Sequence, residues 1–215
     1  MKKLWLLLLG AMLCTGAMAQ KNGRAAYKDS LSVFRVLYKA DFLKEERSPF
    51  FHHPKCVDSL RFFEPDMDYR VWAAITLTPE SKPFDMPTSS GKLKPHKQYG
   101  VLSFTLKGKP YQLSLYQNMN LVKEEKYKNE LFLPFKDHTN SITTYGGGRY
   151  IDLQLGDVVT DPATGERRIL IDFNKCYNPY CAYKDGYNCP IPPSENYLPL
   201  PVKAGEKIYA GHHLD

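Results

Sequence analysis

The chain has 215 residues, of which 43% are hydrophobic and 24% are charged, and its formal net charge is +6. These fractions are those of an ordinary globular protein, so they exclude a disordered chain, a collagen and a protein with several membrane spans. At this length a single folded domain is expected, and it can bury roughly 70% of its unfolded surface.

The first nineteen residues predict a secretory signal peptide. Lys2 and Lys3 form a positive start, the run 4–13 is apolar, and Ala17 and Ala19 supply the small residues of a cleavage site. About ten apolar residues are too few to span a bilayer, which takes roughly 20. We therefore expect residues 1–19 to be removed and residues 20–215 to form one domain.

Export places the mature protein in the periplasm or outside the cell. A lipoprotein signal with Cys14 as the lipid-bearing residue is disfavoured, because Leu13 stands where a small residue is needed. Cleavage lowers the net charge to +4, since it removes Lys2 and Lys3 and no acidic residue. The remaining charges form no basic stripe, which argues against nucleic-acid binding. No second apolar run of membrane length follows, so we expect no transmembrane segment after signal removal.

Residues 27–42 predict an N-terminal helix. Apolar side chains recur at spacings of three and four from Tyr27 to Phe42, which is one face of a helix. The preceding residues 20–26 are expected to be frayed, and Ser48-Pro49 is expected to end the helix.

After this helix the hydrophobic period changes to two, which is typical of strands. A strand is predicted over 69–77. Two hairpins are predicted, one joining 99–106 to 111–115 and one joining 150–159 to 168–173. The fold class is therefore mainly β: an antiparallel β barrel or sandwich with one N-terminal α-helix and a long irregular C-terminal segment.

Residues 79–97 contain four prolines and are expected to be a loop. Gly146-Gly147-Gly148 lacks the residues of a phosphate-binding loop, so we expect a turn where the backbone passes closely.

Four cysteines remain after signal removal, at positions 56, 176, 181 and 189. An even number in an exported chain favours disulfides, and four cysteines allow three pairings. The spacing is not that of a zinc knuckle, and only His212-His213 lies near enough in sequence to add a ligand. No metal and no cofactor are therefore predicted.

The segment 174–201 departs from regular patterns. It holds six prolines and five tyrosines, and the aromatic content argues against a disordered tail. We predict a rigid wrapped loop with a Cys181–Cys189 bridge, which either seals the end of the barrel or forms one wall of a site.

Several motifs resemble a bacterial family known only as a domain of unknown function, DUF1684. They are Phe84-Asp85-Met86-Pro87-Thr88, Tyr99-Gly100, Leu133-Pro134-Phe135-x-Asp137-x-Thr139, Tyr145 to Tyr150, Asp172-Phe173-Asn174, Tyr177 to Tyr183, Cys189 to Asn196, and Ala204-Gly205-Glu206. The resemblance implies that Cys181 and Cys189 belong to the family pattern. Cys56 and Cys176 depart from the pattern, and this suggests a second bridge between them. The resemblance brings no substrate, reaction or cofactor.

The polar residues of these motifs are the candidate ligand-binding residues. They are Asp137, Thr139, Arg149, Asp172, Asn174, Tyr177, Asn178, Glu195 and Asn196. We expect an ion pair between Arg149 and Asp172, because their strands are predicted to be neighbours. Such a pair would either clamp the C-terminal loop or supply the charge of a polar-ligand pocket.

The sequence therefore predicts an exported module that binds a small polar ligand or has a structural role. The alternative is a small periplasmic hydrolase that uses carboxylates near Arg149, with Asp137 and Glu195 as its acid and base.

Overall fold

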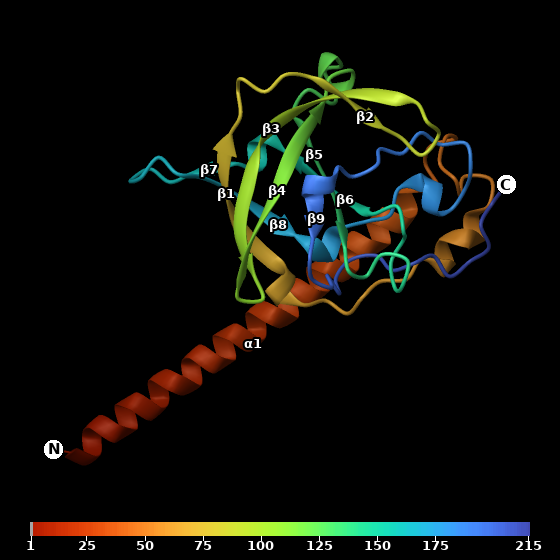
Figure 1. Cartoon of the computed structure of the whole chain (residues 1–215). Coiled ribbons are helices and arrows are strands. Elements are labelled where there is room, and N and C mark those ends of the chain that lie inside the picture. The colour runs from red at the N-terminus through yellow and green to blue at the C-terminus, as the bar shows by residue number, and fades with distance from the viewer. Residues whose placement is uncertain (1) are drawn as a thin grey trace. The chain divides into compact units, whose positions relative to one another are not determined.

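The computed structural model describes residues 2–215, with side chains described from residue 22 onward (Figure 1). The chain divides into two compact units, residues up to Asp41 and residues Phe42–Asp215. Each unit is described separately below.

The first unit is one long helix, α1, over Lys2–Asp41. It contains the predicted helix but begins earlier and ends sooner than expected, so residues 20–26 are helical and Ser48-Pro49 lies beyond its end. The predicted signal peptide is helical in its backbone, and its side chains lie outside the described residues. Among the residues that the structure describes, no helix is both long and apolar enough to cross a membrane.

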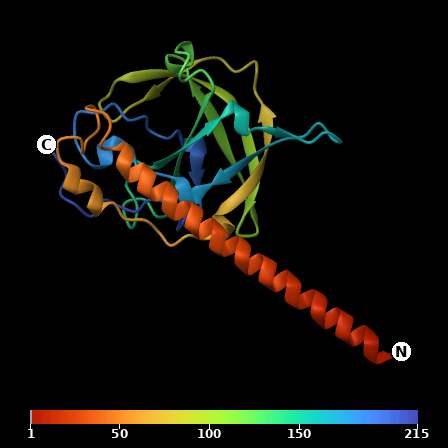
Figure 2. The same cartoon turned by 180° about the vertical axis from the view of Figure 1, so that it is seen from behind.

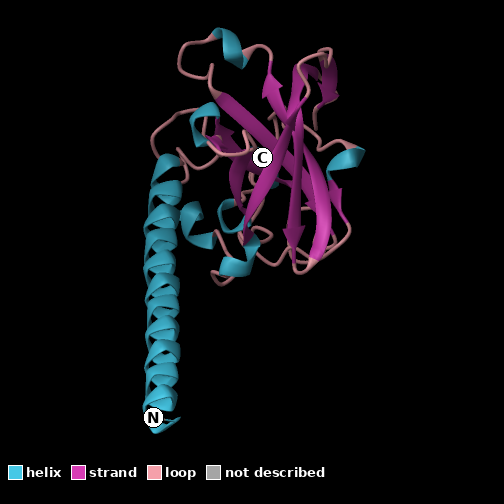
Figure 3. Cartoon of the chain, turned by 90° about the vertical axis from the view of Figure 1, so that its left-hand side faces the viewer, coloured by secondary structure: helices cyan, strands magenta, loops and turns pink. Residues whose placement is uncertain are grey.

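The second unit is built on one sheet of nine strands. The strands are β1 (Arg70–Leu77), β2 (Phe84–Pro87), β3 (Leu93–Leu106), β4 (Lys109–Asn118), β5 (Glu130–Asp137), β6 (Arg149–Gln154), β7 (Val159–Thr160), β8 (Arg167–Asp172) and β9 (Tyr197–Leu198). Their order is β6-β5-β4-β3-β1-β8-β7, with antiparallel neighbours. β2 adds to β3, and the short β9 runs parallel to β5. The sheet curls into a half-barrel, as Figure 3 shows.

The inner face of the sheet carries the hydrophobic core. The alternation read from the sequence is confirmed: Ala73, Leu102, Leu113, Leu153 and Ile169 all lie in this core. Burying a side chain of the size of leucine or isoleucine contributes about 1.5–3 kcal/mol relative to leaving it in water. The curled sheet therefore depends mainly on this one apolar face.

A two-residue turn joins β3 to β4. Lys107 and Gly108 both have positive φ, at 49° and 77°, which is the geometry of the turn that matches the twist of a hairpin. The first predicted hairpin is thus confirmed, with its strands longer than expected.

The second predicted hairpin is only partly right. The strand that starts near Tyr150 ends at Gln154 and pairs with β5, at the opposite end of the sheet from β8. The partner of β8 at the turn is the two-residue β7, and their joining turn projects from the edge of the sheet (Figure 2). Patterning identified the strands' faces but could not assign their neighbours.

Three strands, β2, β5 and β9, lie where none was predicted. β2 and the beginning of β3 occupy the expected loop 79–97. β5 was missed because the run Leu131 to Phe135 is interrupted by Pro134, and proline is uncommon inside strands.

Gly148 is the position where the backbone passes closely, as predicted. Its φ is +97°, and a Cβ there would lie 2.8 Å from the Phe135 carbonyl oxygen and 2.7 Å from Pro192. Only glycine fits without displacing both neighbours, and this close turn sets the start of β6 next to the end of β5.

Candidate functional site

Arg149 opens β6 and its side chain is completely buried. Its guanidinium donates to Asp137 Oδ2 at 2.7 Å, and the Asp137 side chain is also inaccessible to solvent. It donates further to the carbonyl oxygens of Val202 at 2.9 Å and Ala204 at 2.5 Å. A buried charge is tolerated only when it is paired and hydrogen-bonded in this way.

The Asp137 carboxylate also forms several hydrogen bonds. Asp137 Oδ1 accepts from the backbone N–H of Thr139 at 2.7 Å and of Val202 at 3.1 Å. Arg149 and Asp137 thus bind residues 202–204 from both sides, and we call this cluster the Arg149 clamp. It fastens the C-terminal segment to the ends of β5 and β6.

The expected ion pair between Arg149 and Asp172 is wrong. Asp172 ends β8, and its Oδ1 accepts from the backbone and side-chain nitrogens of Asn174, both at 3.1 Å. It also forms an ion pair with Arg70, whose Nε lies 3.8 Å from Oδ2. The prediction failed because β6 and β8 are far apart in the strand order.

Asn174 and Asn178 also hold backbone together. The Asn174 side chain exchanges two hydrogen bonds with the main chain of Asp66, at 2.9 and 2.8 Å. Asn178 donates its backbone N–H to the buried Glu206 carboxylate at 2.9 Å and its side-chain amide to the Lys207 carbonyl at 2.8 Å. These contacts tie distant segments of chain to one another.

Glu195 and Asn196 lie in a short helical turn before β9. The Tyr116 hydroxyl donates to Glu195 at 2.7 Å. The Asn196 amide accepts from the Ser114 N–H at 2.7 Å and donates to the Ser114 carbonyl at 2.8 Å and to the Pro134 carbonyl at 2.6 Å. Asn196 therefore bridges β4 and β5 at the point where these strands separate.

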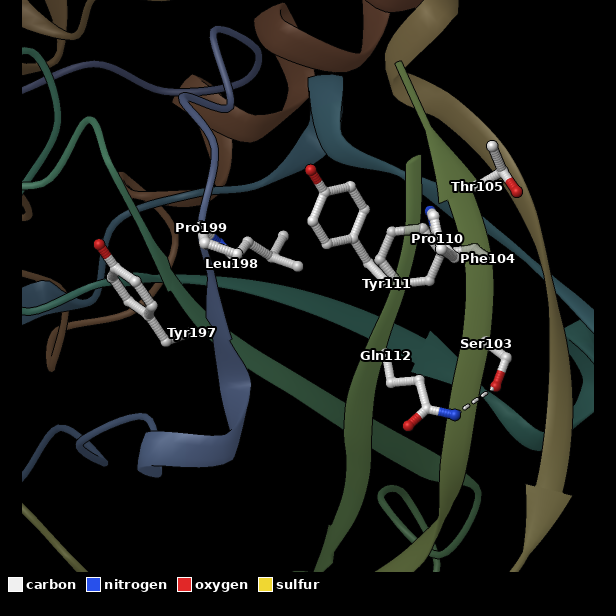
Figure 4. A pocket seen from close by; sticks show the side chains of 9 residues that line it. All are labelled: Ser103, Phe104, Thr105, Pro110, Tyr111, Gln112, Tyr197, Leu198 and Pro199. Atoms are coloured by element: carbon white, nitrogen blue, oxygen red, sulfur yellow. Dashed lines mark hydrogen bonds between the residues drawn. The ribbon is translucent and has the colours of Figure 1, made fainter. Parts of the chain in front are cut away.

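An open groove lies next to this separation, between β4 and β9 (Figure 4). Its volume is about 650 Å3. It is lined by Ser103, Phe104, Thr105, Pro110, Tyr111, Gln112, Tyr197, Leu198 and Pro199. The lining combines aromatic rings, hydroxyls and one amide with no charged side chain. We call this the β4–β9 groove.

Tyr177 reaches a pair of carboxylates that the sequence reading did not single out. Its hydroxyl donates to Asp152 at 2.7 Å. Asp152 in β6 and Glu130 in β5 lie diagonally across the two strands, because Glu130 is in register with Gln154. Water reaches the Asp152 side chain, yet the surrounding protein displaces enough hydration to raise its pKa. The pKa of Glu130 is also raised, by burial and then by the charge of Asp152.

The predicted disulfide bonds are confirmed in part. Cys181 and Cys189 form a disulfide with an S–S distance of 2.34 Å. Ser89 fastens this bridge, since its main chain and hydroxyl both bond to Cys189. The suggested Cys56–Cys176 bridge is wrong, because both thiols are free. Cys176 is buried, donates to the Ala204 carbonyl, and has a pKa raised to about 11 by burial.

Within residues 22–215, no three or more His, Cys, Asp or Glu side chains are grouped so as to hold a metal ion. The nine predicted ligand-binding residues do not form one site. Asp137, Thr139 and Arg149 are brought together in the clamp, whereas Asp172 with Asn174, Tyr177, Asn178, and Glu195 with Asn196 make separate contacts. All of the groove residues were missed, because the groove depends on β5 and β9, which the pattern did not reveal.

A family model described as a protein of unknown function, DUF1684, matches residues 56–207. The chain belongs to this family. The matched residues include the Arg149 clamp, the Cys181–Cys189 disulfide and every residue of the β4–β9 groove. These features therefore lie in the part of the chain that makes it a DUF1684 protein.

The DUF1684 protein is similar to a solved structure, the solution NMR structure of an uncharacterized protein of Haloarcula marismortui. The two share 31% sequence identity, with 85% of this chain and 95% of that chain covered, and the TM-score is 0.62. None of the curated proteins is similar to the DUF1684 protein.

Proposed function

We propose that this DUF1684 protein is an exported, non-catalytic module that binds a polar ligand in the β4–β9 groove. The observation that carries the proposal is the contrast between the groove, which is open, and the Arg149 clamp, which is closed. A ligand needs polar groups that can exchange water for ligand contacts. Gln112, Tyr111 and Tyr197 line the groove, whereas the clamp's polar groups are used within the protein.

The hydrolase alternative receives less support from the geometry. A general base must reach a substrate or a water molecule. The Asp137 side chain has no contact with solvent and is ion-paired to Arg149, while the Tyr116 hydroxyl donates to Glu195. Asp137 therefore serves the fold, and the exposed Glu195 is left without the carboxylate partner that the hydrolase alternative gives it, so we favour binding over catalysis.

The rings at the groove suggest how a ligand would be held. Tyr197 is 46% exposed and lies at one wall, with its ring 5.7 Å from that of His138. Aromatic side chains supply large contact area, and their hydroxyls offer hydrogen bonds at the rim. A polar ligand with one flat or apolar side fits this lining.

Thermal unfolding of the purified protein with a panel of oligosaccharides, nucleotides and peptides tests the proposal. A ligand at 100 times its Kd stabilises the folded state by about 2.7 kcal/mol, which raises the midpoint by about 5–10 °C at this size. The shift is expected to be lost in Tyr197→Ala. It is expected to persist in Trp72→Ala, a control that removes a ring of similar exposure (52%) that is not among the groove's lining residues. No shift with any ligand class, or an equal shift in Tyr197→Ala, would contradict the proposal.

A further inference from the structure

The strand β4 is paired along its whole length on one side and at a single register position on the other. Its pairing with β3 runs from Lys109 to Asn118, whereas its register with β5 is limited to Tyr116 against Phe132. Beyond that point β4 and β5 diverge, and the groove lies beside the free side of β4 (Figure 4).

Asn196 shows which way the main chain of β4 faces. Its side-chain amide accepts a hydrogen bond from the Ser114 N–H and donates one to the Ser114 carbonyl, as the main chain of a neighbouring strand would. The peptide groups of Ser114 therefore point away from β3. Since successive residues of a strand point their peptide groups to opposite sides, those of Gln112 and the Pro110 carbonyl also point away from β3, toward the groove.

Gln112 thus presents an N–H and a carbonyl to the groove, and Pro110 presents a second carbonyl. Within the described part of the chain, no residue forms a hydrogen bond with these main-chain groups. A strand edge of this kind is a template for pairing with another extended chain. The edge is short, and Pro110 offers no N–H, so it admits only a short strand.

The charges around the groove restrict the occupant further. No carboxylate lines it. Lys109 begins β4 at one end of the free edge, and Lys136 of β5 is in register with Tyr197 of β9. Both lysines stand next to lining residues rather than among them. Neither lysine forms an ion pair within the described residues. An acidic occupant would complement these two lysines.

We propose that the β4–β9 groove binds an extended, acidic polypeptide segment, which adds to the edge of β4 through the main chain of Gln112. This inference rests on the proposed binding function and names its ligand class. Main-chain pairing supplies affinity in this mode of recognition, and side-chain contacts supply specificity. Here Tyr197 and Tyr111 would contact alternate side chains of the added strand.

The probe is a phage-displayed library of linear twelve-residue peptides, selected against the purified protein. Enriched sequences are expected to contain Asp or Glu. Their synthetic, fluorescein-labelled forms are then measured by fluorescence anisotropy. Binding is expected to weaken as salt is added, since exposed charges are screened, and to weaken in the double variant K109E/K136E.

Gln112→Pro tests the main-chain contact directly. It removes the N–H that faces the groove and leaves the bonds to β3 in place. The loss of one hydrogen bond and the added ring predict binding weaker by about tenfold or more. Gln112→Ala is the matched control, because it removes the side chain and keeps the N–H, and its affinity is expected to stay within about threefold.

N-methylation of the peptide gives a test that leaves the protein unchanged. Methyl groups on every second amide are expected to abolish binding to the wild-type protein, and those on the alternate amides to be tolerated, because a strand donates to one neighbour only at alternate positions.

Failure to enrich linear peptides, or binding that survives methylation at every amide, would overturn the strand-addition proposal. If an oligosaccharide or nucleotide still stabilises the wild type but not Tyr197→Ala, the binding function stands with a different ligand. If neither peptides nor any of these compounds bind, both proposals fail.

Discussion

Arg149 carries a permanent charge into the interior and is stabilised there by one carboxylate and by carbonyls of residues 202–206. The carbonyl partners lie 53–57 residues away in sequence, and the carboxylate of Asp137 lies 12 residues away on the neighbouring strand. The free-energy cost of removing its charge from water is offset only while all of these partners are in place. The residue therefore works as a fastening point for the C-terminal segment.

Arg149→Leu is expected to lower the free energy of unfolding by about 3–5 kcal/mol, because it leaves Asp137 charged and buried without its partner. Urea denaturation followed by circular dichroism measures this change. Arg70→Leu is the control: its ion pair to Asp172 is long, at 3.8 Å, and its side chain is 41% exposed. Its expected change is below about 1 kcal/mol. Equal losses in both variants would argue against the clamp.

Asp152 predicts a pH dependence of stability. Protein atoms around its carboxylate displace hydration and raise its pKa in the folded protein, while the Tyr177 hydrogen bond opposes this shift, so the folded state binds this proton more tightly than the unfolded chain does. Because water still reaches the side chain, the effect on stability is small. The resulting penalty is absent below the unfolded pKa of about 3.9 and grows as the pH rises through the folded pKa. The charge of Asp152 also raises the pKa of Glu130.

Asp152→Asn is therefore expected to raise the unfolding midpoint at pH 7 and to have little effect near pH 4. Asparagine keeps an acceptor for the Tyr177 hydroxyl. Thermal scans at the two pH values measure the difference, with Asp85→Asn on the exposed β2 as a control that should change neither. A variant that is less stable than the wild type at pH 7 would disprove this account.

At the scale of elements, the separation of β4 from β5 organises both the fold and the groove. Asn196 occupies the main-chain groups of Ser114 and Pro134 that the two strands no longer share. The helical turn 194–196 thus ends the β4–β5 pairing and leaves the rest of the β4 edge open.

Asn196→Ala is expected to destabilise the protein by about 3 kcal/mol, because it leaves three buried main-chain groups without partners. Chemical denaturation measures the loss. Asn120→Ala is the matched control, since the Asn120 side chain is exposed and caps no helix, and its expected change is within about 0.5 kcal/mol. A loss below about 1 kcal/mol for Asn196→Ala would mean that water replaces the amide.

The strands show what hydrophobic alternation in the sequence can and cannot predict. Alternation in 69–77, 99–106 and 111–115 correctly predicted which side chains enter the core. It also placed Ile151 and Leu153 correctly, but not the neighbour of their strand. Alternation depends on residues two positions apart, whereas pairing depends on contacts between segments that are tens of residues apart.

At the scale of the whole molecule, export and the state of the cysteines can be tested together. Mass spectrometry of the protein secreted by an expression host is expected to show an N-terminus at Gln20 and the loss of two hydrogens, for one disulfide. Iodoacetamide should modify the partly exposed Cys56 in the native protein, and Cys176 only after unfolding.

Loss of four hydrogens in that experiment would restore the second bridge that the sequence suggested. Retention of residues 1–19 would contradict export by signal cleavage. Native modification of two thiols would mean that Cys176 is more accessible than its burial of 99% indicates.

The sequence by itself determined the mainly β class, the inward face of each predicted strand, the Cys181–Cys189 pair and the likeness to DUF1684. All of these depend on the spacing of residues within one segment or on short sequence motifs. Only the tertiary structure decided that Arg149 meets Asp137 and not Asp172, that Cys56 and Cys176 stay apart, and that the edge of β4 is open. Each of these depends on which strands become neighbours, and that is settled by the packing of the whole sheet rather than by any one segment.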